Sequence, residues 1–465
     1  MKNSTRLIAL HPSSHTSQPS SVRIVALGCA KNKVDSERVA ASFAENGWDV
    51  VPDGKADVVI VTTCGFIEEA SQESINVLLE EIEAKGRGET SCLVAAGCLP
   101  ERYRNDLADE LPVLDIIAGV SEFGRLRQLV EEWFAKPGRR ACFTKGRPTP
   151  IAEGPRLLSG VPGQAWLKIA DGCNRACSFC TIPGIRGSWQ SVPMTGLIQE
   201  ARTLVESGVV ELTLTAQDTT AYGFEGGKPR LWQLLRELDS ISGLRWIRLM
   251  YAHPRGFADE LIDAVVDCEK VLAYLDIPMQ HASDRMLKLM NRKIDAAGQN
   301  RLLATLRDRI PDLVMRTTLL VGHPGETEED FEELLEFAAK QRFENLGAFA
   351  YSREDGTASS KMADQVPAEV AADRLDRLMS MQQEISRQAL HKQIGCETEV
   401  LVEEELPPAE DLRYTHSGRA SIQAPEVDGI TYLHVPAGQK AHPGQIVKAR
   451  IEISSEYDLF ATASD

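Results

Sequence analysis

The sequence predicts an α/β protein with three folded parts: a doubly wound parallel-sheet domain, a central open (β/α) barrel and a small all-β barrel. Short, nearly continuous apolar runs indicate parallel strands that are buried on both faces, and helical stretches separate these runs. Beyond Gly395 the helical period disappears, and strand-like runs alternate with Gly and Pro. The first two patterns predict the two α/β parts, and the third predicts the β barrel.

Residues 22–135 are predicted to form the parallel-sheet domain. Apolar runs at residues 22–27, 57–62 and 92–96 are its predicted strands, and residues 66–85 carry apolar side chains at helical spacing. Strands that alternate with helices in this way are typical of a small doubly wound α/β fold. In such a fold, ligands bind at the carboxyl ends of the strands.

A Pro- and Gly-containing segment over residues 136–163 is a predicted linker. Strands and helices then alternate again over residues 164–394, which predicts a parallel barrel with its site at the strand C-terminal ends. Residues 395–465 are predicted to be the all-β module, of OB-like size. The six predicted barrel strands are residues 166–170, 210–215, 246–251, 272–277, 314–321 and 346–351.

Charge and composition restrict the possible partners of the chain. The 465 residues carry a formal net charge of −17, which repels phosphate backbones, and no apolar run approaches the roughly 20 residues that cross a bilayer. The polar stretch at residues 1–21 lacks the apolar core of a signal peptide, so we expect a disordered leader there. We therefore expect a cytoplasmic protein without membrane contact, whose ten cysteines are reduced.

The strongest functional signal is a loop that carries Cys173, Cys177 and Cys180 in the sequence DGCNRACSFC. The loop follows the first barrel strand, where active-site loops are expected. Three thiolates can bind three irons of a four-iron cluster and leave the fourth iron open to a small molecule with an amine and a carboxylate. The alternatives are buried structural thiols or a zinc knuckle, but the loop contains no His to complete a zinc site.

A second set of cysteines is less obvious from spacing. Cys29, Cys64 and Cys98 each follow one of the three N-terminal strands, and each adjoins a Gly. Because parallel strands end at one edge of a sheet, we expect these cysteines to converge on a second cluster. The alternative is that they only fill the core, as buried cysteines often do. The remaining cysteines share no such placement and are predicted to be structural: Cys92, Cys142, Cys268 and Cys396.

The CxxxCxxC loop, with an aromatic residue before the last cysteine at the start of a βα barrel, resembles the radical S-adenosylmethionine superfamily. The resemblance implies that Cys173, Cys177 and Cys180 bind a [4Fe–4S] cluster, and that Phe179 lies near the adenine of S-adenosylmethionine. It further implies one-electron reduction by a donor such as flavodoxin or ferredoxin. The resulting 5′-deoxyadenosyl radical abstracts hydrogen from carbon that side-chain bases cannot deprotonate.

Two cysteine sets followed by a β module resemble the methylthiotransferases over nearly the whole chain. This family inserts sulfur into an unactivated C–H bond and adds a methyl group. The resemblance implies two [4Fe–4S] clusters, the second held by Cys29, Cys64 and Cys98, and a TRAM-like C-terminal domain. It assigns no catalytic side chain beyond the cluster ligands.

Several segments resemble the branch of this family that modifies an aspartate on the twelfth small-subunit ribosomal protein. The transfer-RNA branch typically has Gln and Met where Ala30 and Lys31 stand. The resemblance implies methylthiolation of the aspartate β-carbon, with the ribosomal protein or the assembled subunit as partner; an adenosine in transfer RNA is the alternative substrate. The segments are LGCAKN (27–32), VDSE (34–37), TCGFI (63–67), ESI (73–75), AQDTTAYG (216–223), DIPMQH (276–281) and MNR (290–292).

Charge provides an independent argument about the substrate. Residues 395–465 contain five basic and thirteen acidic residues, a net charge of −8. This sign disfavours nucleic-acid binding by the C-terminal module and suits a basic ribosomal protein. The alternative is that the excess charge only keeps a surface solvated.

Weaker signals concern cofactor contacts. Gln217 and Asp218 end the second barrel strand and are candidates for contact with cofactor or substrate, although Asp218 is equally typical of a turn. Gly322 and Gly325 lie between a strand and a helix, where their backbone could contact the cofactor. His323 receives no role, because family members often carry an aromatic residue there and a lone loop His is more often solvent-facing or structural.

A rival function of another class is a non-catalytic iron–sulfur electron carrier or a ribosome-associated scaffold. A full α/β barrel disfavours this rival, since electron carriers rarely need such a pocket.

Overall fold

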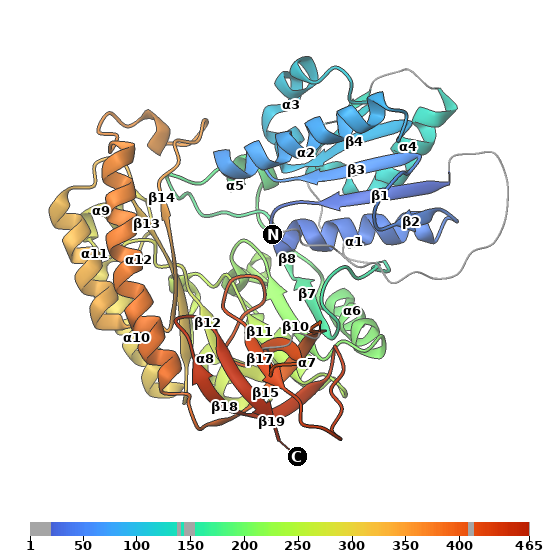
Figure 1. Cartoon of the computed structure of the whole chain (residues 1–465). Helices are drawn as coiled ribbons and strands as arrows, with labels where there is room; N and C mark the ends of the chain where they lie inside the picture. Colours follow the sequence, from blue (N-terminus) through green and yellow to red (C-terminus); the bar gives the residue numbers. More distant parts are fainter. Residues whose placement is uncertain (1–19, 137–140, 144–153, 408–412, 465) are drawn as a thin grey trace.

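The computed structural model describes residues 20–136, 141–143, 154–407 and 413–464, and it contains the three predicted parts (Figure 1). Residues 1–19 of the predicted leader and residues 137–140 and 144–153 of the predicted linker lie outside the described residues. No helix in the described part of the chain is long and apolar enough to cross a membrane.

The N-terminal part is a six-stranded sheet in the order β2-β1-β3-β4-β5-β6, in which every paired strand is parallel. The three predicted strands are confirmed as β1 (Ser21–Ala26), β3 (Val58–Thr63) and β4 (Cys92–Gly97). Every residue of β3 and β4 is buried, which explains their unbroken apolar sequence. The helices are α1 (Ala30–Ala44), α2 (Glu68–Gly86), α3 (Cys98–Glu110) and α4 (Leu126–Ala135).

Three further strands of this sheet were not predicted: β2 (Asp49–Val51), β5 (Ile116–Ala118) and β6 (Ala141–Phe143). Each has only three residues, too few to show a period. β6 also corrects the predicted linker over residues 136–163, because Ala141 pairs with Ile116 of β5 and the segment extends the sheet.

The central part is an open parallel sheet of six strands in the order β14-β13-β12-β11-β10-β7, and its two edge strands do not pair with each other. All six predicted strands are present: β7 (Gln164–Lys168), β10 (Glu211–Thr215), β11 (Trp246–Leu249), β12 (Val271–Asp276), β13 (Val314–Val321) and β14 (Asn345–Ala350). The longer helices are α6 (Met194–Glu206), α7 (Leu231–Asp239), α8 (Asp259–Asp267), α10 (Ala296–Arg309), α11 (Glu328–Gln341) and α12 (Ala368–His391).

Amphipathic helices cover this sheet and close its core. In α7 the leucines at 231, 234, 235 and 238 are all buried, the spacing of one helical face. Short elements shape the strand C-terminal side, namely β8 (Ala170–Asp171), β9 (Gln190–Ser191), α5 (Ile182–Arg186) and α9 (Asp284–Leu289).

The C-terminal part is a closed five-stranded barrel in the order β15-β16-β17-β19-β18, which confirms the predicted small β barrel. Alternate residues of its strands point inward, and Val400, Val402, Leu433, Ile451 and Leu459 form its apolar core. Its strands are β15 (Glu397–Glu405), β16 (His416–Ala420), β17 (Thr431–His434), β18 (Ile446–Ser454) and β19 (Leu459–Ala463).

A buried ion cluster fixes this barrel on the central sheet. Glu211, the first residue of β10, accepts hydrogen bonds from Arg248 at 2.8 Å and from Arg419 of β16 at 2.6 Å. All three side chains are at most 2% exposed. Arg419 also pairs with Glu403 of β15 at 2.5 Å. Because buried charges must be paired, this cluster permits one orientation of the barrel.

We predict that Arg419→Met lowers the free energy of unfolding by about 3–5 kcal/mol, because it leaves the buried Glu211 with one cationic partner fewer. Arg413→Met is the matched control, since Arg413 pairs with Glu452 at the surface and its side chain is 52% exposed. Thermal unfolding and limited proteolysis of both variants check the prediction. Equal stability of the two variants would contradict it.

Candidate active site

The predicted cysteine loop lies at the C-terminal side of the barrel strands, between β8 and α5. Cys173 is buried, and Cys177 and Cys180 are partly exposed. The backbone is fixed on both sides: Cys173 N–H donates to the Gly187 carbonyl at 3.1 Å, and Ser178 N–H donates to the Met290 carbonyl at 3.1 Å. The loop therefore has a defined conformation before any ligand binds.

The sulfur atoms of this loop face polar donors and one another. Cys173 Sγ accepts from Arg175 N–H at 3.3 Å, and Cys177 Sγ accepts from Arg292 Nη1 at 3.4 Å. Burial, together with the neighbouring Cys177 and Cys173, raises the pKa of Cys180 to about 12. Thiols crowded in this way need an added cation to be held as thiolates, and iron would supply that charge.

The donor set therefore fits an iron–sulfur cluster. Within the described ranges, no three His, Cys, Asp or Glu side chains are placed to hold a single metal ion. A four-iron cluster is larger than one ion and binds each thiolate through a different iron. The ligand role of Cys173, Cys177 and Cys180 remains a prediction, based on their sulfur chemistry and placement.

The second set of cysteines also gathers at one edge of its sheet. Cys29 precedes α1, Cys64 follows β3, and Cys98 begins α3. A Cβ on Gly28 would lie 2.7 Å from Cys64 Cβ, and a Cβ on Gly65 would lie 3.0 Å from the Cys98 carbonyl. Only Gly permits this close approach of the three loops.

Asn32 ties these loops together. Its side-chain amide donates to the Leu27 carbonyl at 3.1 Å and to the Thr63 carbonyl at 2.9 Å, while the Cys98 thiol donates to its oxygen at 3.9 Å. Burial raises the pKa of Cys98 to about 12. The structure thus brings together a second group of three thiols suited to soft metal chemistry, whose role as ligands stays a prediction.

A buried network joins the two cysteine sets. Arg186, from the barrel, donates to Asp35 of α1 and to Asp171 at 3.0 Å each, and it also donates to the Asn32 side-chain oxygen. Lys168 of β7 pairs with the same two carboxylates. These four charged side chains, which we call the domain-joining network, are at most 7% exposed.

The positive charge of Arg186 also affects the pKa values of the second set of cysteines. Burial alone would raise the pKa of Cys29, but the neighbouring Lys31 and Arg186, together with the backbone N–H groups of Asn32 and Lys31, lower that pKa. Burial raises the pKa values of Cys64 and Cys98, and the positive charge of Arg186 opposes this increase. Sequence reasoning missed this network, although Lys168 inside an apolar strand was a signal, since a buried charge requires a partner.

Gln217 is well placed for the predicted ligand contact. Its amide nitrogen donates to Asp171 at 3.0 Å, and its oxygen is buried without a hydrogen-bond partner among the described residues. A ligand donor would satisfy that oxygen. Asp218, by contrast, is already paired with Arg175 at 2.8 Å and with Thr220 at 2.5 Å.

Phe179 packs against the apolar cluster of Met286, Met290 and Leu320, and its ring meets His323 edge to face at 6.3 Å. His323 is fully buried and has a structural role. Its Nε2 lies 2.7 Å from Ser359 Oγ and 3.3 Å from Ser178 Oγ, so it links the cysteine loop to the segment after β14. Burial lowers its pKa to about 4, and the imidazole is neutral at pH 7.

Gly322 and Gly325 already contact other parts of the protein, and their predicted contact with the cofactor stays a prediction. A Cβ on Gly322 would lie 2.5 Å from the Cβ of Ala371 on α12, and its N–H donates to the Glu326 carboxylate. The Gly325 N–H donates to the Asp364 carbonyl at 2.6 Å. Both amides are thus engaged by the protein, and helix packing accounts for Gly322.

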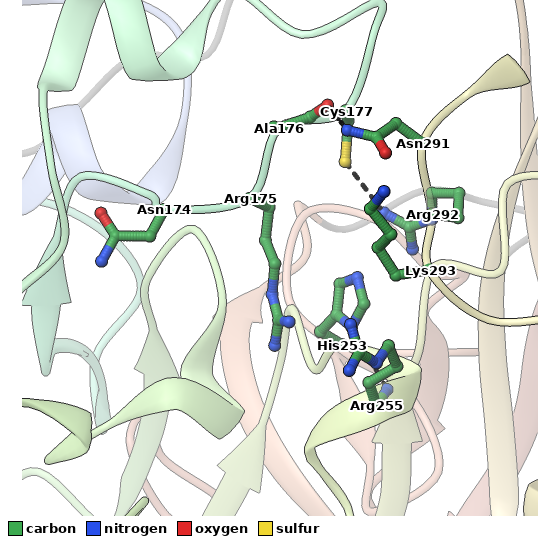
Figure 2. A pocket seen from close by; sticks show the side chains of 9 residues that line it. All are labelled: Asn174, Arg175, Ala176, Cys177, His253, Arg255, Asn291, Arg292 and Lys293. Atoms are coloured by element: carbon green, nitrogen blue, oxygen red, sulfur yellow. Dashed lines mark hydrogen bonds between the residues drawn. The ribbon is translucent and has the colours of Figure 1, made fainter. Parts of the chain in front are cut away.

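A cavity of about 170 Å³ opens beside the cysteine loop (Figure 2). Four basic side chains line it, and no acidic side chain does. Arg175 extends from the cysteine loop toward His253. The lining residues are Asn174, Arg175, Ala176, Cys177, His253, Arg255, Asn291, Arg292 and Lys293.

We predict that Arg186→Met lowers the free energy of unfolding by about 3–5 kcal/mol, because it leaves Asp35 and Asp171 buried with one cation for two carboxylates. Thermal unfolding measures this loss, and iron analysis after anaerobic reconstitution should show less iron retained per chain. Arg387→Met is the control, since that side chain is about half exposed and forms a surface pair with Glu384. Wild-type stability of Arg186→Met would refute the structural role of the network.

Comparison with known proteins agrees with this architecture. Residues 167–338 match the radical SAM superfamily, residues 21–119 match the uncharacterized protein family UPF0004, and residues 394–463 match the TRAM domain. Among solved structures, the radical S-adenosylmethionine methyltransferase TsrM from Kitasatospora setae has a TM-score of 0.55 at 14% identity and covers 74% of each chain. That likeness shows the fold alone.

Curated relatives match over nearly the whole chain. The ribosomal protein uS12 methylthiotransferase RimO of Anaeromyxobacter sp. (strain K) is 46% identical over 93% of this chain and 91% of its own length. The protein of the same name from Symbiobacterium thermophilum is 43% identical over 96% and 92%. Together with the barrel cysteine loop and the closed C-terminal barrel, these matches show that the chain belongs to the RimO family of radical SAM methylthiotransferases.

Proposed function

We propose that this chain methylthiolates the β-carbon of an aspartate in ribosomal protein uS12. Its curated relatives are named for a methylthiotransferase reaction on that protein, which supports the substrate. The net charge of −8 over residues 395–465 supports a basic protein partner rather than a nucleic acid. The reaction would take place in the cytoplasm, with electrons from a donor such as flavodoxin or ferredoxin.

Each of the two groups of thiols would hold one cluster, and the two clusters would serve different steps of the reaction. Cys173, Cys177 and Cys180 would hold one [4Fe–4S] cluster, and Cys29, Cys64 and Cys98 would hold the other. When bound, the clusters and S-adenosylmethionine would supply a carbon radical, a sulfur atom and a methyl group. Gln217 would orient the cofactor through its buried oxygen, which has no hydrogen-bond partner within the described ranges, and Phe179 would form an apolar wall beside the cysteine loop.

The observation that carries this proposal is the domain-joining network. Arg186 donates to Asn32 and to Asp171. Asn32 also accepts a hydrogen bond from the Cys98 thiol, and Asp171 accepts one from the Gln217 amide. A short chain of buried hydrogen bonds therefore runs from one cysteine set to the predicted cofactor site. A reaction with two steps at two sites on one substrate requires such a fixed relation.

We expect the reconstituted, reduced enzyme to add a methylthio group to purified uS12 and not to transfer RNA. Incubation with each substrate separately, followed by mass spectrometry for methylthio addition, checks this expectation. Modification of an adenosine in transfer RNA, with uS12 unchanged, would instead establish the alternative function. Absence of 5′-deoxyadenosine on addition of dithionite and S-adenosylmethionine would support the electron-carrier rival.

Replacement of a cysteine should affect a different step of the reaction in each of the two sets. Cys173→Ala should abolish cleavage of S-adenosylmethionine, whereas Cys64→Ala should retain cleavage and lose the methylthiolated product. Each variant should retain about half of the wild-type iron, because each removes one ligand of one cluster. Cys396→Ala, at an exposed cysteine outside both sets, is the control. Product formation at the wild-type rate by Cys64→Ala would disprove the role of the second set.

A further inference from the structure

The cavity beside the cysteine loop is strongly cationic in a chain whose overall charge is −17. Arg175, Arg255, Arg292 and Lys293 line it, together with neutral side chains (Figure 2). These residues come from three separate segments, namely the cysteine loop, the turn after β11 and the turn after α9. Convergence of like charges from three segments costs stability unless an anion binds there.

Arg292 forms the inner wall of this cavity. It is 6% exposed, its Nη2 donates to the Pro278 carbonyl at 2.6 Å, and its Nη1 donates to Cys177 Sγ. Its Nε is buried and has no hydrogen-bond partner among the described residues. The neighbouring Asn291 amide donates to the Ala176 carbonyl at 2.6 Å and holds this turn against the cysteine loop.

The positive charge is largely uncompensated. Arg175 pairs with Asp218 through Nε at 2.8 Å. In the described part of the chain, Arg255, Arg292 and Lys293 form no salt bridge with a carboxylate. Burial, with Arg292, Arg175 and Arg255 nearby, lowers the pKa of His253 to about 2, so its imidazole adds no charge. An anionic ligand would therefore gain several charge-assisted hydrogen bonds at once.

The shape and placement of the cavity favour a carboxylate. Guanidinium groups match the planar carboxylate bidentately, and about 170 Å³ accommodates a short acidic side chain. Arg255 and Lys293 are exposed, so the cavity opens to solvent on the side from which a protein loop would enter. Cys177, one of the predicted cluster ligands, also lines the cavity.

We propose that this cavity binds the carboxylate of the acceptor aspartate of the substrate protein and so holds the adjacent β-carbon beside the cysteine loop. The inference rests on the proposed function. The carboxylate is one bond away from the reacting carbon, so fixing it positions that carbon for hydrogen abstraction. Arg255 and Lys293 would recognise the substrate, and this contact would distinguish aspartate from neutral side chains.

A double-mutant cycle tests this contact. The acceptor aspartate of uS12 is first located by mass spectrometry and then changed to asparagine, and the affinity of this uS12 is measured for wild-type enzyme and for Arg255→Gln. We expect each single change to weaken binding about tenfold and the two together to cost little more than either alone. Lys293→Gln is a second variant with the same expected behaviour. Arg236→Gln, at an exposed arginine on α7, is the control and should bind like wild type.

Further measurements separate the possible sources of the carboxylate. Binding and cleavage of S-adenosylmethionine without uS12 should be unchanged in Arg255→Gln and Lys293→Gln. If either variant weakens cofactor binding about tenfold, the cavity binds the cofactor carboxylate and the inference is wrong. The inference is also wrong if the losses of affinity for uS12 are fully additive, or if both enzyme variants bind uS12 like wild type. If wild-type enzyme modifies uS12 in these cases, only this inference fails; if it neither binds nor modifies uS12, the proposed function fails with it.

Discussion

The domain-joining network is the interaction on which the rest of the structure depends. Asp35, Lys168, Asp171 and Arg186 are two anions and two cations with almost no access to water. Each would be very costly to bury alone, and together they compensate one another. The pairing is possible in only one arrangement of the N-terminal domain on the barrel. It thereby sets where the two cysteine sets lie relative to each other.

Helix α1 carries further buried charged residues that pair across the interface between the N-terminal domain and the barrel. Lys31, Asn32, Asp35, Glu37 and Arg38 are all buried, although a surface helix would expose such residues. Further along the helix, Arg38 pairs with Glu200 of α6 at 2.6 Å, and Arg156 pairs with Glu37 at 2.5 Å. The helix is therefore an interface between two domains, held by ion pairs that fix orientation more than they add stability. Glu211 and Arg419 do the same for the C-terminal barrel.

Much of this could be predicted from the sequence, for identifiable reasons. Strands such as β3 and β4 are buried at every position, so their sequence is a continuous apolar run; β2, β5 and β6 are too short to give such a signal. The placement of Cys29, Cys64 and Cys98 followed from strand order. The contacts of Arg186 with Asn32 and Asp35 did not, because each joins residues more than 150 positions apart. Likewise Gly322 faces Ala371, and only the packed helix α12 reveals that contact.

The domain-joining network should hold the two proposed cluster sites at a fixed separation. The most direct test is pulsed electron paramagnetic resonance on the reconstituted, reduced protein, which measures the distance between two paramagnetic clusters. We predict a single narrow distance distribution in the wild type and a broad one in Arg186→Met. A signal from only one cluster, or an equally broad distribution in the wild type, would contradict the account.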